Sequence, residues 1–125
     1  MTPTARTLLL ELPFPPSVNR YYRHVVIGRR VATLLSAQGR AFKADVRAAW
    51  LCGKFDKLSG RLSMRIRLHC QTRRRYDCDN FGKAVADSLQ GLAYDDDSQI
   101  DILLIERGEA WKGGACIVGI EEIEV

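Results

Sequence analysis

Apolar residues occur in short blocks along the chain, and the spacing within each block predicts its secondary structure. The first block, Thr7–Leu12, is compatible with a strand. The segment Pro13–Pro16 must end that strand, because proline fixes φ and lacks an amide donor. A Val/Ile run interrupted by Gly28-Arg29-Arg30 follows. The first part of the chain is therefore predicted to form a strand, a loop and a short hairpin.

Two later segments carry apolar residues at helical spacing. The first runs from Ser36 to Leu51, with Gly53 as its expected C-terminal stop. The second runs from about Asp79, a good N-cap residue, to Gly91. The predicted buried faces are Phe42, Val46, Ala49 and Trp50 in the first helix, and Phe81, Ala84, Val85, Leu89 and Leu92 in the second.

Strict alternation of apolar and polar residues marks Arg61–Cys70 as the clearest strand. Two more strands are predicted at Gln99–Glu106 and Ala115–Ile123, and the glycines of Arg107–Gly114 suit a hairpin connection between them. The predicted order is strand, hairpin, helix, strand, helix, strand, strand. This order predicts a single α+β domain over residues 1–125, with two main helices against a mixed β-sheet.

Composition allows one globular core, since the chain has 125 residues of which 46% are hydrophobic and 27% charged. A formal charge of +4 suits a polyanionic partner without identifying one. The four cysteines show no CxxC spacing and are expected to be reduced thiols. No leader segment and no run of ~20 apolar residues is visible, so a soluble, cytoplasmic protein without a membrane association is expected.

Acidic residues from two parts of the chain form the main candidate site. Asp77 and Asp79 lie two residues apart at the end of a predicted strand, so their carboxylates are expected to share a face and one ion. Lys83 follows four residues later, on the same face of the predicted helix. Asp95-Asp96-Asp97 precedes another strand, which could bring this second acidic group beside Asp77. Oxygen ligands of this kind suit Mg²⁺, and Lys83 would add positive charge at a phosphate.

Basic and aromatic residues lie next to these acids. Arg73-Arg74-Arg75 directly precedes Asp77, so phosphate-attracting charge borders metal-attracting charge. Tyr21 and Tyr22 could stack on exposed bases, or could equally be core residues beside the proline turn. The residues predicted to contact DNA are Arg73, Arg74, Arg75, Arg20, Tyr21, Tyr22 and Arg23.

Three stretches together resemble the RusA-type Holliday junction resolvases: Leu12–His24, Arg73–Ala84 and Asp96–Gln99. They occur in the family's order and at similar spacing over nearly the whole chain. The resemblance implies an endodeoxyribonuclease of DNA recombination and repair, a homodimer that introduces paired, Mg²⁺-dependent nicks across four-way junction DNA. Relatives are often encoded by phages or prophages.

The resemblance also implies roles for individual residues. By motif, Asp77, Asp79 and Asp97 are the metal ligands, Asp96 is an auxiliary acid and Lys83 is the essential lysine. Two other functions stay open at this point. One is a junction-binding protein that does not cleave DNA, and the other is a Mg²⁺-dependent phosphohydrolase that acts on nucleotides.

Overall fold

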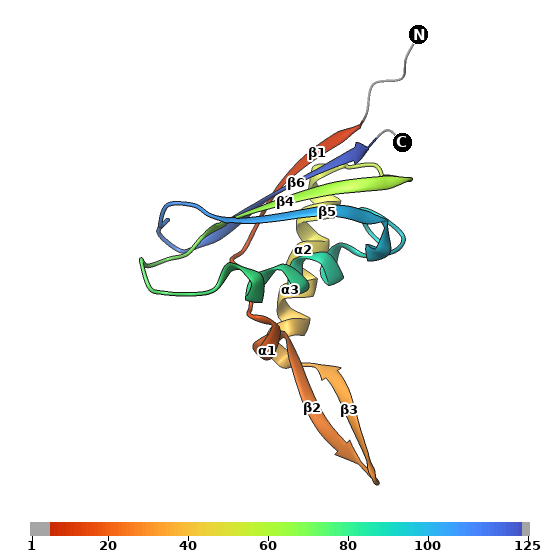
Figure 1. The fold of residues 1–125 in the computed structure, drawn as a ribbon, viewed down its shortest axis with the longest axis vertical. Coiled ribbons are helices and arrows are strands. Elements are labelled where there is room, and N and C mark those ends of the chain that lie inside the picture. The colour runs from red at the N-terminus through yellow and green to blue at the C-terminus, as the bar shows by residue number, and fades with distance from the viewer. Residues whose placement is uncertain (1–5, 124–125) are drawn as a thin grey trace.

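A four-stranded sheet forms the centre of the molecule in the computed structural model, which describes residues 6–123 (Figure 1). The strands are β1 (Thr7–Leu12), β4 (Arg61–His69), β5 (Ile100–Arg107) and β6 (Ala115–Ile123), in the order β1-β6-β4-β5. Strand β4 pairs antiparallel with β6 and parallel with β5, so the sheet is mixed. The predicted α+β class is confirmed.

The connection between β5 and β6 differs from the prediction. The predicted hairpin at Arg107–Gly114 is wrong, because β4 lies between β5 and β6 in the sheet. The connection instead crosses the carboxyl end of β4, where the Gly108 amide donates to the Leu68 carbonyl at 2.7 Å. Glycines suit a tight hairpin and a longer crossing connection equally well. They therefore do not show which strands pair, because strand pairing is decided by the packing of the whole sheet.

Two helices cover one face of the sheet (Figure 1). They are α2 (Ala37–Gly53) and α3 (Gly82–Leu89), which lie within the two predicted helical segments apart from two residues at the end of α2. Every second residue of β1 and β4 is buried beneath them, which follows from the two-residue period of a strand. Each fully buried aliphatic side chain contributes about 1.5–3 kcal/mol to folding. The core includes Leu8, Leu10, Leu12, Phe42, Val46, Trp50, Leu62, Met64, Ile66, Leu68, Val85, Leu89, Val118 and Ile120.

The ends of α2 show one confirmed and one corrected prediction. Ser36 is the N-cap, and its hydroxyl accepts the Gly39 amide at 2.9 Å. Gly53 is not the stop after the helix but its last residue, and Lys54 takes the left-handed conformation instead. A Cβ at position 53 would lie 1.9 Å from the ring of Phe55, so glycine is needed there for close packing.

The second helical segment begins later than predicted. Asp79 is not an N-cap, because Cys78–Phe81 forms a 3₁₀ turn, η1, with Asp77 at the N-cap position. Helix α3 then starts at Gly82, where a Cβ would come within 2.5 Å of the Ile105 side chain on β5. The glycine that weakens the helical pattern therefore lets the Ile105 side chain pack closely against the start of the helix.

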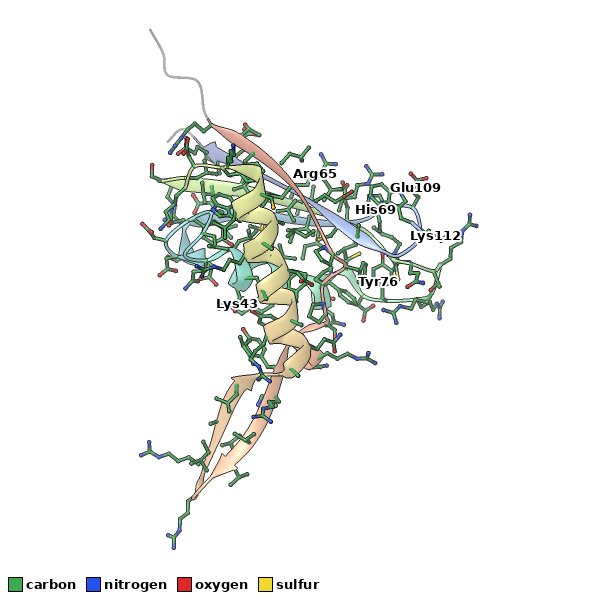
Figure 2. All side chains as sticks on the ribbon, turned by 180° about the vertical axis from the view of Figure 1, so that it is seen from behind. Lys43, Arg65, His69, Tyr76, Glu109 and Lys112 are labelled. Atoms are coloured by element: carbon green, nitrogen blue, oxygen red, sulfur yellow. The ribbon has the colours of Figure 1, made fainter. Side chains whose placement is uncertain are left out.

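A β-hairpin projects away from this body (Figure 1). It consists of β2 (Tyr22–Ile27) and β3 (Arg30–Leu35), as predicted, and follows a single helical turn, α1 (Val18–Tyr21), that the sequence did not predict. The hairpin's side chains extend to both sides (Figure 2), and its apolar residues near the tip are largely exposed. In the described part of the chain, no helix is long and apolar enough to cross a membrane.

Candidate active site

The loop before β5 is held in place by its own polar side chains. The Gln99 side-chain oxygen accepts the amides of Asp95 and Asp96 at 3.0 Å each, and its amide group donates to the Gly60 carbonyl at 3.0 Å. Asp96 caps the short 3₁₀ turn η2 (Asp97–Gln99) by accepting the Ser98 amide at 2.9 Å. Hydrogen bonds from Ser98 lower the pKa of Asp96. The carboxylate of Asp96 is thus occupied within the loop.

Asp97 points instead toward the helix that carries Lys83. The Lys83 ammonium lies 3.5 Å from a carboxylate oxygen of Asp97. Tyr22 lies near both charged groups. Burial and then the charge of Asp87 raise the pKa of its phenol. The charge of Lys83 lowers this pKa, and that of Asp97 raises it. The structure therefore brings Lys83, Asp97 and Tyr22 together from three separate parts of the chain.

The other two predicted ligands lie at the turn η1, just before α3. Asp77 has extended backbone angles, φ −93° and ψ 123°, and Asp79 lies within the η1 turn. Because β4 ends at His69, the two-residue strand period does not set the relative orientation of these carboxylates. Asp77 follows the carboxyl end of β4, whereas Asp97 precedes the amino end of the parallel strand β5. Adjacent strand ends therefore do not bring Asp97 beside Asp77.

The donor chemistry of this region fits a hard divalent cation, since carboxylate oxygens are the protein ligands that Mg²⁺ prefers. The carboxylates themselves lie farther apart than the ligands of one ion would. Over residues 6–123, no three His, Cys, Asp or Glu side chains come together as a metal-binding group. The structure joins Asp97 to Lys83, and it does not join Asp77 and Asp79 to that pair.

Arginines surround Asp77 as the sequence predicts. A cavity of about 380 Å³ is lined by Arg20, Arg74, Arg75 and Asp77, together with Asn80 and aromatic and proline residues. Guanidinium groups bind phosphate oxygens well because their donors form a planar fork. The same cavity therefore offers phosphate-binding groups and a carboxylate.

One predicted DNA contact is wrong. Tyr21 has no exposed surface, and its hydroxyl donates to a carboxylate oxygen of Asp87 at 2.5 Å. The alternative interpretation, a core residue beside the proline turn, is the one the structure supports. Its neighbour Tyr22 is partly exposed and Arg23 is exposed, so both stay available as predicted contacts.

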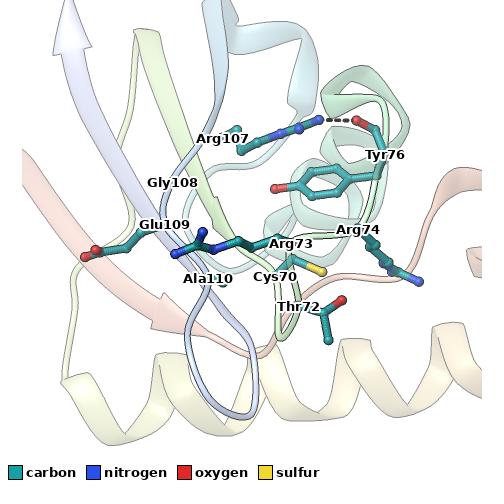
Figure 3. A pocket seen from close by; sticks show the side chains of 9 residues that line it. All are labelled: Cys70, Thr72, Arg73, Arg74, Tyr76, Arg107, Gly108, Glu109 and Ala110. Atoms are coloured by element: carbon teal, nitrogen blue, oxygen red, sulfur yellow. Dashed lines mark hydrogen bonds between the residues drawn. The ribbon is translucent and has the colours of Figure 1, made fainter.

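Arg107 is a basic residue near this site that the sequence did not single out. Its guanidinium lies 4.3 Å from the centre of the Tyr76 ring and donates to the Tyr76 carbonyl (Figure 3). Tyr76 immediately precedes Asp77. The sequence gives no sign of this role, because Arg107 is the last residue of β5 and charged residues are common at strand ends. The segment Arg107–Gly114 was also predicted to be a hairpin, which would keep Arg107 away from Tyr76.

An α+β domain with three arginines and the Asp77 carboxylate in one cavity has the charge that proteins acting on nucleic-acid phosphates need. The model of one family, endodeoxyribonuclease RusA, matches residues 13–121. The chain belongs to the RusA family, and the resemblance predicted from the motifs is confirmed. It is therefore a member of a family of DNA-hydrolysing enzymes.

Curated relatives carry the same family name. The chain is 35% identical over 119 residues to the crossover junction endodeoxyribonuclease RusA of Escherichia coli K12 and to that of Shigella sonnei Ss046. It is 35% identical over 120 residues to the crossover junction endodeoxyribonuclease of Enterobacteria phage 82. Each match covers 94% of this chain and 96% of the relative. The phage relative agrees with the expected link to phages.

Proposed function

We propose that the protein resolves four-way (Holliday) DNA junctions by paired, Mg²⁺-dependent hydrolysis of phosphodiester bonds. The observation that carries this proposal is the cavity in which Arg20, Arg74 and Arg75 meet the carboxylate of Asp77. Relatives that align with nearly the full chain are named for cleavage at crossover junctions, which supports the same substrate.

We propose Asp77, Asp79 and Asp97 as the metal ligands, with Asp96 as an auxiliary acid. The Ser98 hydrogen bond supports this division, because it holds the Asp96 carboxylate within its own loop, whereas the Asp97 carboxylate lies beside Lys83. Three carboxylates at one point repel one another, by about 1 kcal/mol per pair at 4 Å in water, so a cation is needed to hold them together. When bound, Mg²⁺ would lower the pKa of a water molecule and neutralise charge on the phosphate.

Lys83 is the protein's own cation at this site. Hydrolysis forms a bond from a water oxygen to phosphorus and breaks the bond to one ester oxygen, which takes up a proton. Negative charge builds on the phosphoryl oxygens during this step, and an ammonium group close by stabilises it. The Asp97 carboxylate at 3.5 Å keeps the Lys83 side chain at the site before DNA binds.

A homodimer is part of the proposal, because two opposing strands must be cut and a two-fold axis provides two equivalent sites. Exposed apolar residues support self-association. They include Leu9, Ile102 and Leu104 on the sheet and Val26, Ile27 and Val31 on the hairpin. Sedimentation equilibrium should give twice the 14.1 kDa mass of one chain.

The decisive experiment uses a labelled four-way junction and a sequence-matched duplex, each with Mg²⁺ or with EDTA. The wild-type protein should nick the junction selectively and only with the metal. Asp79→Asn should bind the junction with similar affinity and cut it at least ~100-fold more slowly, since a carboxylate ligand is lost. Wild-type cutting by Asp79→Asn would remove this residue from the mechanism.

The same experiment separates the other two functions. A junction-binding protein without nuclease activity would bind selectively and leave every strand intact. A nucleotide phosphohydrolase would release phosphate from nucleotides, and its substrate binding would depend only weakly on salt, because few phosphates are contacted.

A further inference from the structure

A hydrogen bond between Tyr21 and Asp87 links two elements that lie far apart in the sequence. Tyr21 is the last residue of α1 and has no exposed surface. Its hydroxyl donates to a carboxylate oxygen of Asp87, in α3, at 2.5 Å. Burial and this hydrogen bond raise the pKa of the Tyr21 phenol, so the hydroxyl keeps the proton that it donates. Helix α1 packs against α3 at the point where the β2–β3 hairpin leaves the body (Figure 1).

Asp87 lies on the same face of α3 as Lys83. The two residues are four positions apart, a spacing at which the side chains of a helix are neighbours and opposite charges attract. The Lys83 ammonium already lies 3.5 Å from a carboxylate oxygen of Asp97. The Tyr22 phenol lies near all three groups: burial and the charge of Asp87 raise its pKa, and the charges of the other two act on it as well. Two carboxylates are therefore within reach of one lysine.

The structure pairs Lys83 with only one of these carboxylates. Among residues 6–123, Asp87 forms no ion pair. The hydrogen bond that it accepts from Tyr21 is assisted by charge, and is therefore stronger than one between neutral groups. The Ser88 hydroxyl lies 3.3 Å from the same phenol oxygen and helps to fix its position. Tyr21 thus occupies the carboxylate that would otherwise compete with Asp97 for Lys83.

We propose that Tyr21 is a positioning residue for DNA cleavage, because it binds the Asp87 carboxylate and so leaves Lys83 free to meet the phosphate that is cut. This inference rests on the proposed function and on the role of Lys83 in it. A lysine held between two carboxylates must give up more attraction to reach a phosphate than a lysine that pairs with one. Tyr21 is buried, so it acts on the reaction only through Asp87 and Lys83.

The test measures single-turnover nicking of a labelled four-way junction in Mg²⁺ by the full-length protein and its variants. Tyr21→Phe removes only the hydroxyl and frees the Asp87 carboxylate to bind Lys83. It should slow nicking about fivefold, which corresponds to about 1 kcal/mol in the barrier. Binding of the junction in EDTA should stay within about twofold of wild type, because the net charge is unchanged.

Tyr94→Phe is the matched control. Tyr94 is also fully buried, and its hydroxyl donates to the Ala86 carbonyl of the same helix at 2.6 Å. Each variant loses one buried hydroxyl that binds α3, so both should have a lower melting temperature than wild type. Only Tyr21→Phe frees a carboxylate, so only this variant should nick more slowly.

Adding Asp87→Asn to Tyr21→Phe tests the route of the effect. The amide carries no charge that could hold Lys83, so the double variant should nick within about twofold of the wild-type rate. A purely structural role of Tyr21 predicts the opposite. The double variant would still lack the hydrogen bond between α1 and α3 and would stay slow.

Equal nicking rates in Tyr21→Phe and Tyr94→Phe overturn the proposal, and so does a double variant as slow as Tyr21→Phe. The comparison of the two single variants decides the question even if the double variant does not fold. Failure of the proposed function has a different signature, because the wild-type protein itself would then not nick junctions with Mg²⁺.

Discussion

Two charged loops flank α3, and they differ in how their charges are used. In the loop before β5 every acidic side chain has a partner: Asp95 pairs with Lys57, Asp96 with the Ser98 amide and Asp97 with Lys83. Asp101, at the start of β5, pairs with Arg61. In the loop after β4, none of Arg73, Arg74, Arg75, Asp77 and Asp79 forms an ion pair with the described residues.

The difference indicates which of the two loops is preorganised by contacts within the protein. Hydrogen bonds from Gln99 fix the backbone of the loop before β5, so Asp97 and Lys83 are oriented in advance. The loop after β4 keeps its charges free for a ligand. These arginines and carboxylates are exposed and form no ion pair with the described residues, so their charges are available to DNA or to a cation.

The largest expected effect compares the neighbouring acids of the first of these loops. Asp97→Asn should slow junction nicking at least ~100-fold in Mg²⁺, since it removes a proposed ligand and the partner of Lys83. Asp96→Asn should stay within a few-fold of wild type, because asparagine caps a helical turn about as well as aspartate. Single-turnover rates on the labelled junction measure both.

Equal losses in the two variants would contradict the division of roles between these acids and would place Asp96 among the ligands. Full activity in Asp97→Asn would show that the ion pair between Lys83 and Asp97 is not needed for cleavage. Junction binding in EDTA provides the control, since both variants should bind at least as tightly as wild type after losing a negative charge.

An intermediate effect is expected from the glutamines of the two loops. Gln99→Ala should reduce the free energy of unfolding by about 1–2 kcal/mol, because two amides and one carbonyl lose a hydrogen-bond partner. Gln71→Ala, in the loop after β4, is the matched control. Its side chain is exposed and makes no hydrogen bond to the described residues, so a change within about 0.5 kcal/mol is expected.

Urea unfolding monitored by circular dichroism measures both free energies. Similar losses in the two variants would show that the loops are equally ordered. The view that the loop before β5 is preorganised and the loop after β4 is not would then be contradicted.

Sequence reasoning predicted the elements of this fold better than their partners. Alternation in Arg61–His69 and helical spacing in α2 depend on neighbours along the chain, so both were predictable. The placement of β6 between β1 and β4 depends on the whole sheet, and glycines in the connection could not reveal it. The same limit explains why Arg107 was not connected with Tyr76.

The candidate site shows the same division. The motifs were enough to name the family and its acidic residues, because each motif is a short run of neighbouring residues. Whether Tyr21 contacts DNA or the core depends on Asp87 and Ser88, which lie 66 and 67 residues away. No local pattern distinguishes a buried tyrosine from an exposed one when both neighbours are aromatic or basic.

The smallest expected effect concerns the pH dependence of stability. Hydrogen bonds from Ser98 lower the pKa of Asp96, and Arg61 lowers the pKa of Asp101, both below the ordinary value of 3.8. The unfolded chain therefore takes up these protons first as the pH falls. The stability that the two carboxylates contribute is fully present above the ordinary carboxyl range and is lost as the pH drops through their lower folded values.

The double variant Asp96→Asn/Asp101→Asn should consequently lose less stability than wild type between pH 5 and about pH 3, measured by urea unfolding at each pH. Asp79→Asn is the control from the loop after β4. The stability of this variant should fall with pH as that of the wild type does, since Asp79 has no ion pair in the described chain. Part of the acid loss remains in every variant, because Arg6 lowers the pKa of Glu122 to about 2. A steeper loss in Asp79→Asn than in the double variant is expected, and the reverse order would mean that the loop after β4 holds its carboxylates more tightly than the loop before β5.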